Sequence, residues 1–161
     1  MKLKKILNET YLIPDSNTDN VFNSLKTVAL NLSGIRNDFI YLHINTFGLS
    51  FKTIHEKFDD YYNQLSADLD KILEIIGMYS KDHEAIPLDL NDNAYVSNKS
   101  EWLRSEENLI YAGRDLIENI LNTLEVARKT VSKNEGIASD LDSIASYWTK
   151  EHAYILKRFV S

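Results

Sequence analysis

The chain has 161 residues, enough for one domain with a proper hydrophobic core, and its 43% hydrophobic and 26% charged residues are typical of a globular protein. It contains no cysteine, which excludes disulfides, thiolate zinc sites and cysteine catalysis. The net charge of −6 argues against a generally basic DNA-binding surface, and no apolar run approaches the length of a membrane span. We find no signal-peptide pattern and expect a cytoplasmic protein.

The first long helix is predicted to follow a short N-terminal arm. Residues 1–15 form this arm, and residues 16–161 form a single helical domain. The helix begins near residues 16–20 and ends before Thr46-Phe47-Gly48-Leu49. Its apolar positions recur in alternating steps of four and three, which is typical of a helix that packs along its whole length. These positions are Val21, Leu25, Val28, Leu32, Ile35, Phe39 and Leu42.

The second helix is predicted from Ser50, a plausible N-cap, to Gly77, a stop signal. Residues 78–100 lack long periodicity and are interpreted as a crossover. A connection of that length suits a bundle whose second and third helices run parallel, because the chain must return along the full length of the bundle. The apolar positions of the second helix are Phe51, Ile54, Phe58, Leu65, Leu69, Ile72 and Ile76.

Two further helices complete the predicted domain. The third covers about residues 100–132, Asn134-Glu135-Gly136 forms a turn, and the fourth covers about residues 137–159. Their apolar positions are Leu109, Ala112, Leu116, Ile117, Ile120, Leu124, Val131, Leu141, Ile144, Trp148, Ile155 and Phe159. The predicted fold class is all-α: a ferritin-like four-helix bundle with a long crossover between the second and third helices.

Five candidate metal ligands stand at fixed spacing: His43, His55, Asp59, Asp70 and Glu74. With His55 at zero and about 100° per helical residue, Asp59 falls near 40°, Asp70 near 60° and Glu74 near 100°. The second helix therefore carries four ligand-type side chains in one stripe. Imidazole and carboxylate ligands suit Fe(II).

The two halves of this stripe are too far apart to share one ion. Asp59 and Asp70 are eleven residues apart, which is about 16 Å of helix. A second copy of the helix, antiparallel across a two-fold axis, would bring His55 and Asp59 of one chain to Asp70 and Glu74 of the other. The midpoint of the stripe, near residues 64–65 (Gln64 and Leu65), would then lie next to the axis. No histidine has a glutamate three residues before it, which argues against an iron site inside a single bundle.

The stretch from Leu42 to Phe51, followed by Ile54-His55-Glu56-Lys57-Phe58-Asp59, resembles the Dps family of bacterial mini-ferritins. The pattern H-x11-H-x3-D-x10-D-x3-E is complete, and the resemblance extends from about residue 18 to the C-terminus. It implies a hollow dodecamer with ferroxidase centres between subunits. One subunit would supply His43, His55 and Asp59, and its neighbour Asp70 and Glu74. It also implies oxidation of Fe(II) by hydrogen peroxide in preference to oxygen, storage of ferric iron and protection against oxidative stress.

The chain departs from the family in two places. Ile44 stands where the family usually has Trp, beside the first ligand histidine. Many members carry a Lys/Arg-rich tail that binds DNA, whereas the arm here has only Lys2, Lys4 and Lys5. Two alternatives stay open: a nucleoid-associated DNA-binding protein with weak oxidase activity, and a helical assembly protein without a metal role.

Three acidic residues at the start of the fourth helix have two interpretations. Glu135, Asp140 and Asp142 could line a pore whose negative potential concentrates Fe(II). They could equally be ordinary N-terminal helix charges, which the helix dipole favours.

Overall fold

The computed structural model describes residues 15–79 and 99–159. This part of the chain contains four long helices, α2 (Asp15–Ile44), α3 (Phe51–Tyr79), α4 (Glu106–Thr130) and α5 (Glu135–Phe159), and one short 3-10 helix, η2 (Lys99–Leu103). It contains no strand, as the all-α prediction requires. The predicted arm, apart from its last residue, and most of the predicted crossover lie outside the described residues. Among the described helices, none combines the length and the apolar character needed to cross a membrane.

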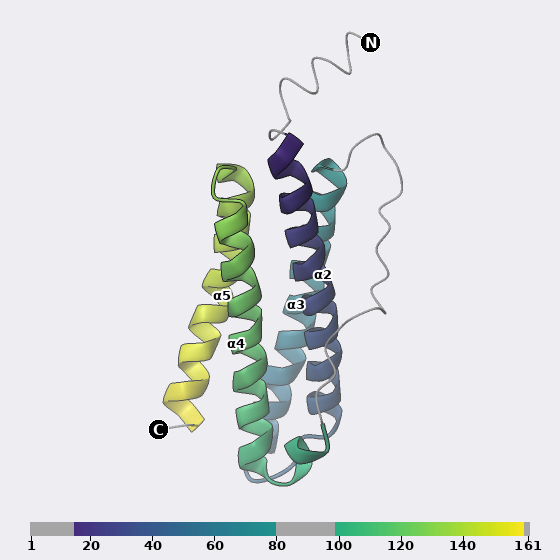
Figure 1. Ribbon diagram of the computed structural model, residues 1–161. Helices are drawn as coiled ribbons and strands as arrows, with labels where there is room; N and C mark the ends of the chain where they lie inside the picture. Colours follow the sequence, from purple (N-terminus) through teal and green to yellow (C-terminus); the bar gives the residue numbers. More distant parts are fainter. Residues whose placement is uncertain (1–14, 80–98, 160–161) are drawn as a thin grey trace.

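The four long helices form one bundle (Figure 1). α2 packs against both α3 and α4, and α4 packs against α5. α2 and α5 run downward in Figure 1, whereas α3 and α4 both run upward. The chain must therefore return along the bundle between α3 and α4, which confirms the crossover. η2, at the end of that return, is fastened to α2 by an ion pair of 2.7 Å between Lys99 and the buried Asp38.

The core follows the apolar periodicity of the sequence. All seven predicted positions of α2 are at most 3% exposed, and the predicted positions of α4 and α5 are buried except the half-buried Phe159. The prediction for Phe51 is wrong, because this first residue of α3 is 46% exposed at the end of the bundle. The periodicity also missed Tyr61, which is fully buried and lies edge-on to Phe39.

Three helix boundaries differ from the predicted ones, and local hydrogen bonds explain the two that start α4 and α5. α3 continues past Gly77 to Tyr79. α4 begins at Glu106 rather than near residue 100, because the Ser105 side chain accepts a hydrogen bond from Asn108 N–H and caps the helix there. α5 begins at Glu135, since the side-chain oxygen of Asn134 accepts from Ile137 N–H. The turn therefore precedes Glu135, and Gly136 lies inside the helix.

Gly113 on α4 leaves room for the ring of Phe58, which reaches it from α3. A Cβ placed there would lie 2.7 Å from Cε1 of Phe58, whereas one on Gly136 would meet only an ordinary contact at 3.5 Å. We expect Gly113→Ala to lower the free energy of unfolding by about 1–3 kcal/mol through overpacking, less the gain in helix propensity. The control Gly136→Ala should raise it by up to about 1 kcal/mol. Urea unfolding of both variants checks this, and a Gly113→Ala variant at least as stable as the parent would contradict it.

Candidate metal centre

Two histidines face each other where α2 ends and α3 begins. His43 lies in the last turn of α2, and His55 lies in the second turn of α3. The hairpin between these helices brings the two imidazole rings into a stack, with centroids 4.0 Å apart and planes 25° apart. Both side chains are half-buried. The structure thus joins two predicted ligands that are twelve residues apart in sequence.

The hydrogen bonds of this pair fix which ring nitrogens remain available. His43 Nδ1 lies 3.2 Å from the carbonyl oxygen of His55, and His55 Nδ1 lies 3.1 Å from the carbonyl oxygen of His43. A carbonyl can only accept, so each Nδ1–H donates and each neutral ring keeps its lone pair on Nε2. Donation from one ring nitrogen to a carbonyl is the usual way in which a protein orients a metal-binding imidazole. The reciprocal bonds therefore prepare both Nε2 atoms for a cation.

Asp59 lies one helical turn beyond His55 and is half-buried. Tyr62 lies beside this carboxylate, which raises the pKa of the Tyr62 hydroxyl. The Tyr62 ring stands edge-on to His43, with centroids 5.3 Å apart. No spacing in the sequence pointed to Tyr62 as a member of this cluster, although its place three residues after Asp59 puts it on the same side of the helix.

Asp70 and Glu74 lie farther along α3, and both are exposed. In the part of the chain that the structure describes, neither carboxylate has a hydrogen bond or an ion pair. No group of three or more His, Asp or Glu side chains within the described ranges of one chain gathers closely enough to hold a metal ion. The structure therefore brings His43 and His55 into contact, whereas Asp59, Asp70 and Glu74 do not join them in a metal-binding group within one chain.

The position next to the proposed two-fold axis needs one correction. Leu65 is fully buried in its own bundle, and Gln64 donates a 2.9 Å hydrogen bond to Asp68. Residues 64 and 65 lie at the middle of the stripe along the helix, but the Leu65 side chain points to the core side of α3. The residues near the midpoint that share the direction of the ligands are Asn63 and Ser66, which are both exposed.

The loop between α2 and α3 is held by the first residue of α4. The Glu106 carboxylate accepts hydrogen bonds from Leu49 N–H at 3.1 Å and Ser50 N–H at 2.8 Å. Ser50 directly precedes α3, as predicted. Gly48 has φ +104°, and a Cβ there would collide with the Glu106 carboxylate. Glu106 thus positions the hairpin that carries the histidines, a role that no sequence spacing indicated.

The hydrogen bonds from Ser50 and Leu49 hold the pKa of Glu106 below its ordinary value of 4.5. A carboxylate with a lowered folded-state pKa stabilises the fold above its unfolded pKa and loses that contribution as pH falls through the folded value. We expect Glu106→Ala to cost about 1 kcal/mol at neutral pH, because the carboxylate is half-exposed to water. The difference from the parent should vanish in acid. Urea unfolding across this pH range checks it, with Glu107→Ala as control; equal losses in both variants would contradict it.

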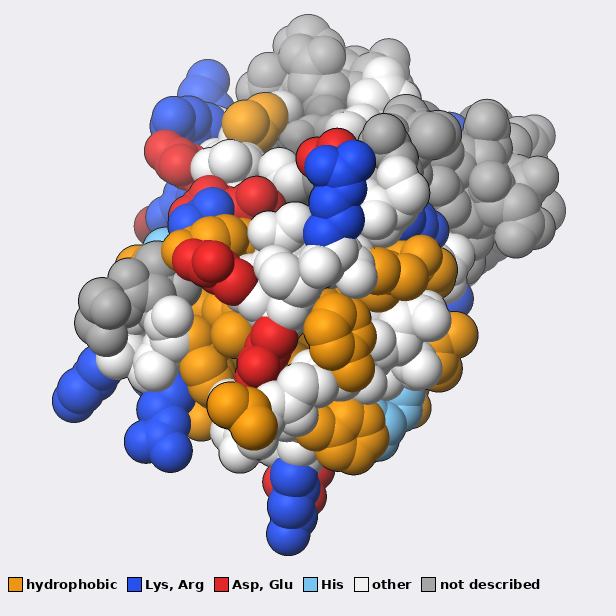
Figure 2. All heavy atoms as spheres, turned by 90° about the horizontal axis from the view of Figure 1, so that it is seen from below, with side chains coloured by type: hydrophobic (Ala, Val, Ile, Leu, Met, Phe, Trp, Pro, Cys, Tyr) orange, Lys and Arg blue, Asp and Glu red, His pale blue; other side chains and the backbone are white. Residues whose placement is uncertain are grey.

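An apolar rim surrounds the histidine pair. It consists of Ile44, Phe47, Leu49 and Phe51, which are 68%, 42%, 104% and 46% exposed. Figure 2 looks onto this end of the bundle and shows hydrophobic side chains gathered there, with histidine at their edge. Phe51 also stacks on His55, with ring centroids 5.0 Å apart. Large apolar side chains exposed in one patch indicate a surface that another protein covers.

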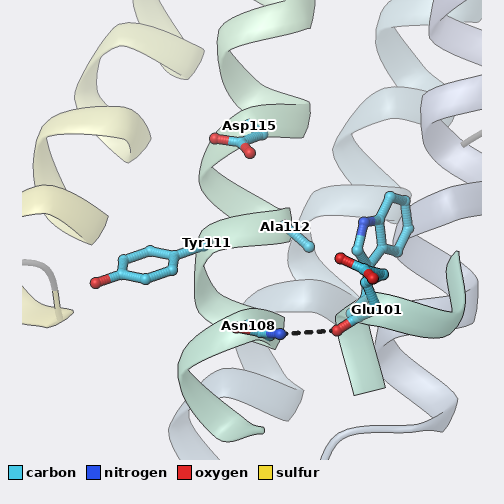
Figure 3. A pocket seen from close by; sticks show the side chains of 6 residues that line it. Glu101, Asn108, Tyr111, Ala112 and Asp115 are labelled. Carbon is cyan, nitrogen blue, oxygen red and sulfur yellow. Dashed lines mark hydrogen bonds between the residues drawn. The ribbon is translucent and has the colours of Figure 1, made fainter. Parts of the chain in front are cut away.

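A hollow beside η2 and the start of α4 holds none of the predicted ligands. It encloses about 380 Å³ and is lined by Glu101, Trp102, Asn108, Tyr111, Ala112 and Asp115 (Figure 3). Arginines pair with both acidic side chains: Arg104 lies 3.1 Å from Glu101, and Arg114 lies 2.7 Å from Asp115. Because these carboxylates are already paired, the hollow is a poor cation site.

The acidic residues at the start of α5 are partly neutralised within the chain. Asp142 pairs with Arg128 at 3.0 Å, and Asp140 pairs with Lys71 at 3.3 Å. Glu135 lies in the first turn of α5. These pairs reduce the negative potential that an iron-attracting pore would need, and the pore stays a prediction for an assembled shell.

Comparison with known proteins gives one consistent result. No protein-family model and no curated protein sequence matches the chain. Among solved structures, a Dps protein from Bacillus brevis has 21% identity and a TM-score of 0.76, covering 92% of this chain and 100% of its own. Dps from Thermosynechococcus elongatus has 20% identity and a TM-score of 0.76, with coverages of 91% and 93%.

A third similar structure is a Dps protein from Vibrio cholerae O1, described as a member of a broad superfamily of ferritin-like diiron-carboxylate proteins. It has 15% identity and a TM-score of 0.72, and the match covers 87% of this chain and 89% of that one. Likeness at these identities establishes the fold. The chain therefore has the ferritin-like four-helix-bundle fold of the Dps proteins.

Proposed function

We propose that this chain is the subunit of a Dps-like mini-ferritin. It binds Fe(II) at sites shared between two copies, oxidises it with hydrogen peroxide in preference to oxygen, and keeps the ferric product inside a dodecameric shell. In each site, His43, His55 and Asp59 come from one copy, and Asp70 and Glu74 from the other. The activity is that of a ferroxidase, with Fe(II) as substrate, and it protects the cytoplasm against oxidative stress.

The observation that carries this proposal is the reciprocally bonded histidine pair. Two carbonyl oxygens hold the Nδ1 atoms of His43 and His55, so both rings keep their Nε2 lone pairs for a cation. In a histidine pair with a purely structural role, we would expect both nitrogens of each ring to form hydrogen bonds with protein groups. Fe(II) accepts imidazole and carboxylate ligands, and an incomplete set from one chain leaves coordination positions for the second chain and for the oxidant.

Two features support sharing of the site between copies. Asp70 and Glu74 are like charges one helical turn apart, and both are exposed and without a partner in the described residues. A cation bound between these carboxylates and the ligands of a facing chain would relieve their mutual repulsion. The apolar rim beside the histidines would be covered by the same contact. A two-fold contact is self-complementary, so it would create two equivalent sites at once.

The proposal is tested by anaerobic titration of the full-length protein with Fe(II), followed by a pulse of hydrogen peroxide while ferric absorbance is recorded. The parent should oxidise iron rapidly, and His43→Ala/His55→Ala should lose that reaction. His152→Ala is the matched control, since His152 bonds Glu118 at 3.0 Å on a different pair of helices. Equal rates in the parent and the double variant would contradict the proposal.

The DNA-binding alternative finds no support among the described residues. The arm, whose three lysines are fewer than in the Lys/Arg-rich tails of the family, lies outside them apart from its last residue. A gel-shift at low salt tests it, because binding through phosphate contacts is strongest there.

A further inference from the structure

We infer that Glu106, on α4, is a positioning residue of the metal centre, whose carboxylate holds the α2–α3 hairpin in the shape that keeps both histidines ready for a cation. The inference rests on the proposed function and adds to it a third helix that sets the affinity of the site. Glu106 belongs to no candidate ligand set, and its carboxylate accepts hydrogen bonds from the backbone of the hairpin at Leu49 and Ser50. Its effect on a cation must therefore pass through that backbone.

The orientation of the histidine pair depends on where the end of α2 and the start of α3 lie. The Nδ1 atoms of His43 and His55 each donate to the main-chain carbonyl of the other residue, at 3.2 and 3.1 Å. Because N–H···O hydrogen bonds span about 2.7–3.2 Å, both bonds lie at the long end of the range. A shift of about half an ångström between the two helix ends would therefore break both bonds and free the two rings.

Two contacts connect the position of the α3 start to His55. The carbonyl of Ser50 accepts a hydrogen bond from Ile54 N–H at 3.0 Å, which closes the first turn of the helix. Phe51, the first residue of α3, stacks on the His55 ring with centroids 5.0 Å apart. Whatever fixes the backbone at Ser50 therefore also fixes the part of α3 that carries His55.

Glu106 fixes that backbone from a different helix. Its Oε1 accepts from Ser50 N–H at 2.8 Å, and its Oε2 accepts from Leu49 N–H at 3.1 Å. Hydrogen bonds to an ionised carboxylate are stronger than those between neutral groups, and two of them on neighbouring N–H groups define both a position and a direction. Because α4 also packs against α2, the two helices that carry the histidines are both held relative to α4.

The loop is shaped for this contact. Gly48 has φ +104°, which glycine adopts freely, and a Cβ at this position would overlap the Glu106 carboxylate. Acidic residues in the first turn of a helix are common, because the helix dipole favours them. Glu107 has this ordinary role: it is exposed, and its carboxylate accepts from Tyr111 on its own helix at 2.6 Å. Glu106 differs from its neighbour in reaching across to the hairpin.

The test measures Co(II) binding to the metal-free, full-length protein by visible absorbance in the parent, Glu106→Gln and Glu106→Ala. Glutamine has no charge but keeps one acceptor oxygen for one of the two N–H groups, so it separates hydrogen bonding from charge. Hydrogen exchange of the hairpin amides, followed by mass spectrometry, reports the order of the hairpin without metal. Size-exclusion chromatography compares the assembly of the variants with that of the parent.

Two control variants isolate the contact from charge and from stability. Glu107→Ala removes the same charge from the neighbouring position on α4. Asn134→Ala removes the side chain that accepts from Ile137 N–H and caps α5, so it destabilises the chain through a lost helix cap. Asn134 precedes α5 at the end of the bundle opposite to the α2–α3 hairpin (Figure 1).

We expect Co(II) affinity to fall about 10-fold or more in Glu106→Ala, as when a side chain that supports a metal ligand is lost, and to fall less in Glu106→Gln. The hairpin amides should exchange faster in the same order. Both control variants should bind Co(II) as the parent does.

Affinity like that of the parent in Glu106→Ala would overturn the inference and leave the proposed function intact. Equal losses in Glu106→Gln and Glu106→Ala would also overturn it, by reducing the effect to charge. The same holds for an equal loss in Asn134→Ala, or for a loss in Glu106→Ala that accompanies a changed assembly, since either would make the effect one of general stability. A parent that binds no Co(II) would instead remove the proposed function, and the inference with it.

Discussion

Replacing Trp148 by alanine should lower the free energy of unfolding by about 3–5 kcal/mol, the largest loss of stability that we expect from a single substitution in this chain. Trp148 is fully buried, and its ring lies 5.6 Å from Tyr61 and 6.4 Å from Phe39 between centroids. Its indole N–H donates to the Asp68 carboxylate at 2.8 Å. Truncation therefore leaves a large cavity and a buried acceptor without its donor at the same time.

The variant Trp148→Phe separates these two contributions. It keeps most of the ring and removes the indole N–H, so that Asp68, which is 5% exposed, retains only the hydrogen bond from Gln64 among the residues that the structure describes. We expect a loss of about 1–3 kcal/mol, the cost of a buried polar group that has lost one partner. Denaturant unfolding at one fixed protein concentration measures both variants, because assembly also stabilises each chain. An alanine variant within about 1 kcal/mol of the parent would contradict this account of the core.

The second large effect is expected far from the histidines. Asp70→Asn/Glu74→Gln should weaken Fe(II) binding about 100-fold or more, since even side chains that only support a metal ligand are worth 10–100-fold. Asp70 is about 22 Å along α3 from His55, so no single chain can explain this loss. Both side chains are exposed, so the substitutions should leave the fold of the chain intact. Anaerobic Fe(II) titration measures the effect.

The matched control for this pair is Asp115→Asn/Glu118→Gln. These carboxylates are also exposed and close together on one helix, but they lie on α4 and face Arg114. Their replacement should leave Fe(II) affinity unchanged. Affinity that is equal in the parent and in Asp70→Asn/Glu74→Gln would mean that the second half of the stripe does not bind iron.

The helices could be predicted well because their periodicity depends only on sequence neighbours. The alternating steps from Val21 to Leu42 identified the buried side of α2 without error. Phe51 fits the same pattern yet is exposed. Periodicity does not show where a helix extends beyond the ends of the helices that it packs against. Capping at Ser105 and Asn134 displaced two helix starts, since a side-chain hydrogen bond to the backbone outweighs the apolar pattern within one turn.

The candidate site could be predicted only as a set of ligands. Spacing placed His55, Asp59, Asp70 and Glu74 on one side of α3, because a helix fixes their directions. It could not supply the contact between His43 and His55, which depends on how the hairpin folds back. It also could not supply Glu106, which reaches the hairpin from a helix that begins 56 residues after Ser50. These contacts between elements give the site its orientation.

The most direct test of the shared site uses two inactive proteins. One is His43→Ala/His55→Ala and the other is Asp70→Asn/Glu74→Gln, produced together with different tags and purified as mixed oligomers. At each mixed two-fold contact, one site then receives the intact histidines of one chain and the intact carboxylates of the other, while the second site receives neither. We predict that peroxide-driven Fe(II) oxidation, absent from each variant alone, returns in the mixed oligomers. Mixed oligomers as inactive as the separate variants would contradict a site built from two copies of this chain.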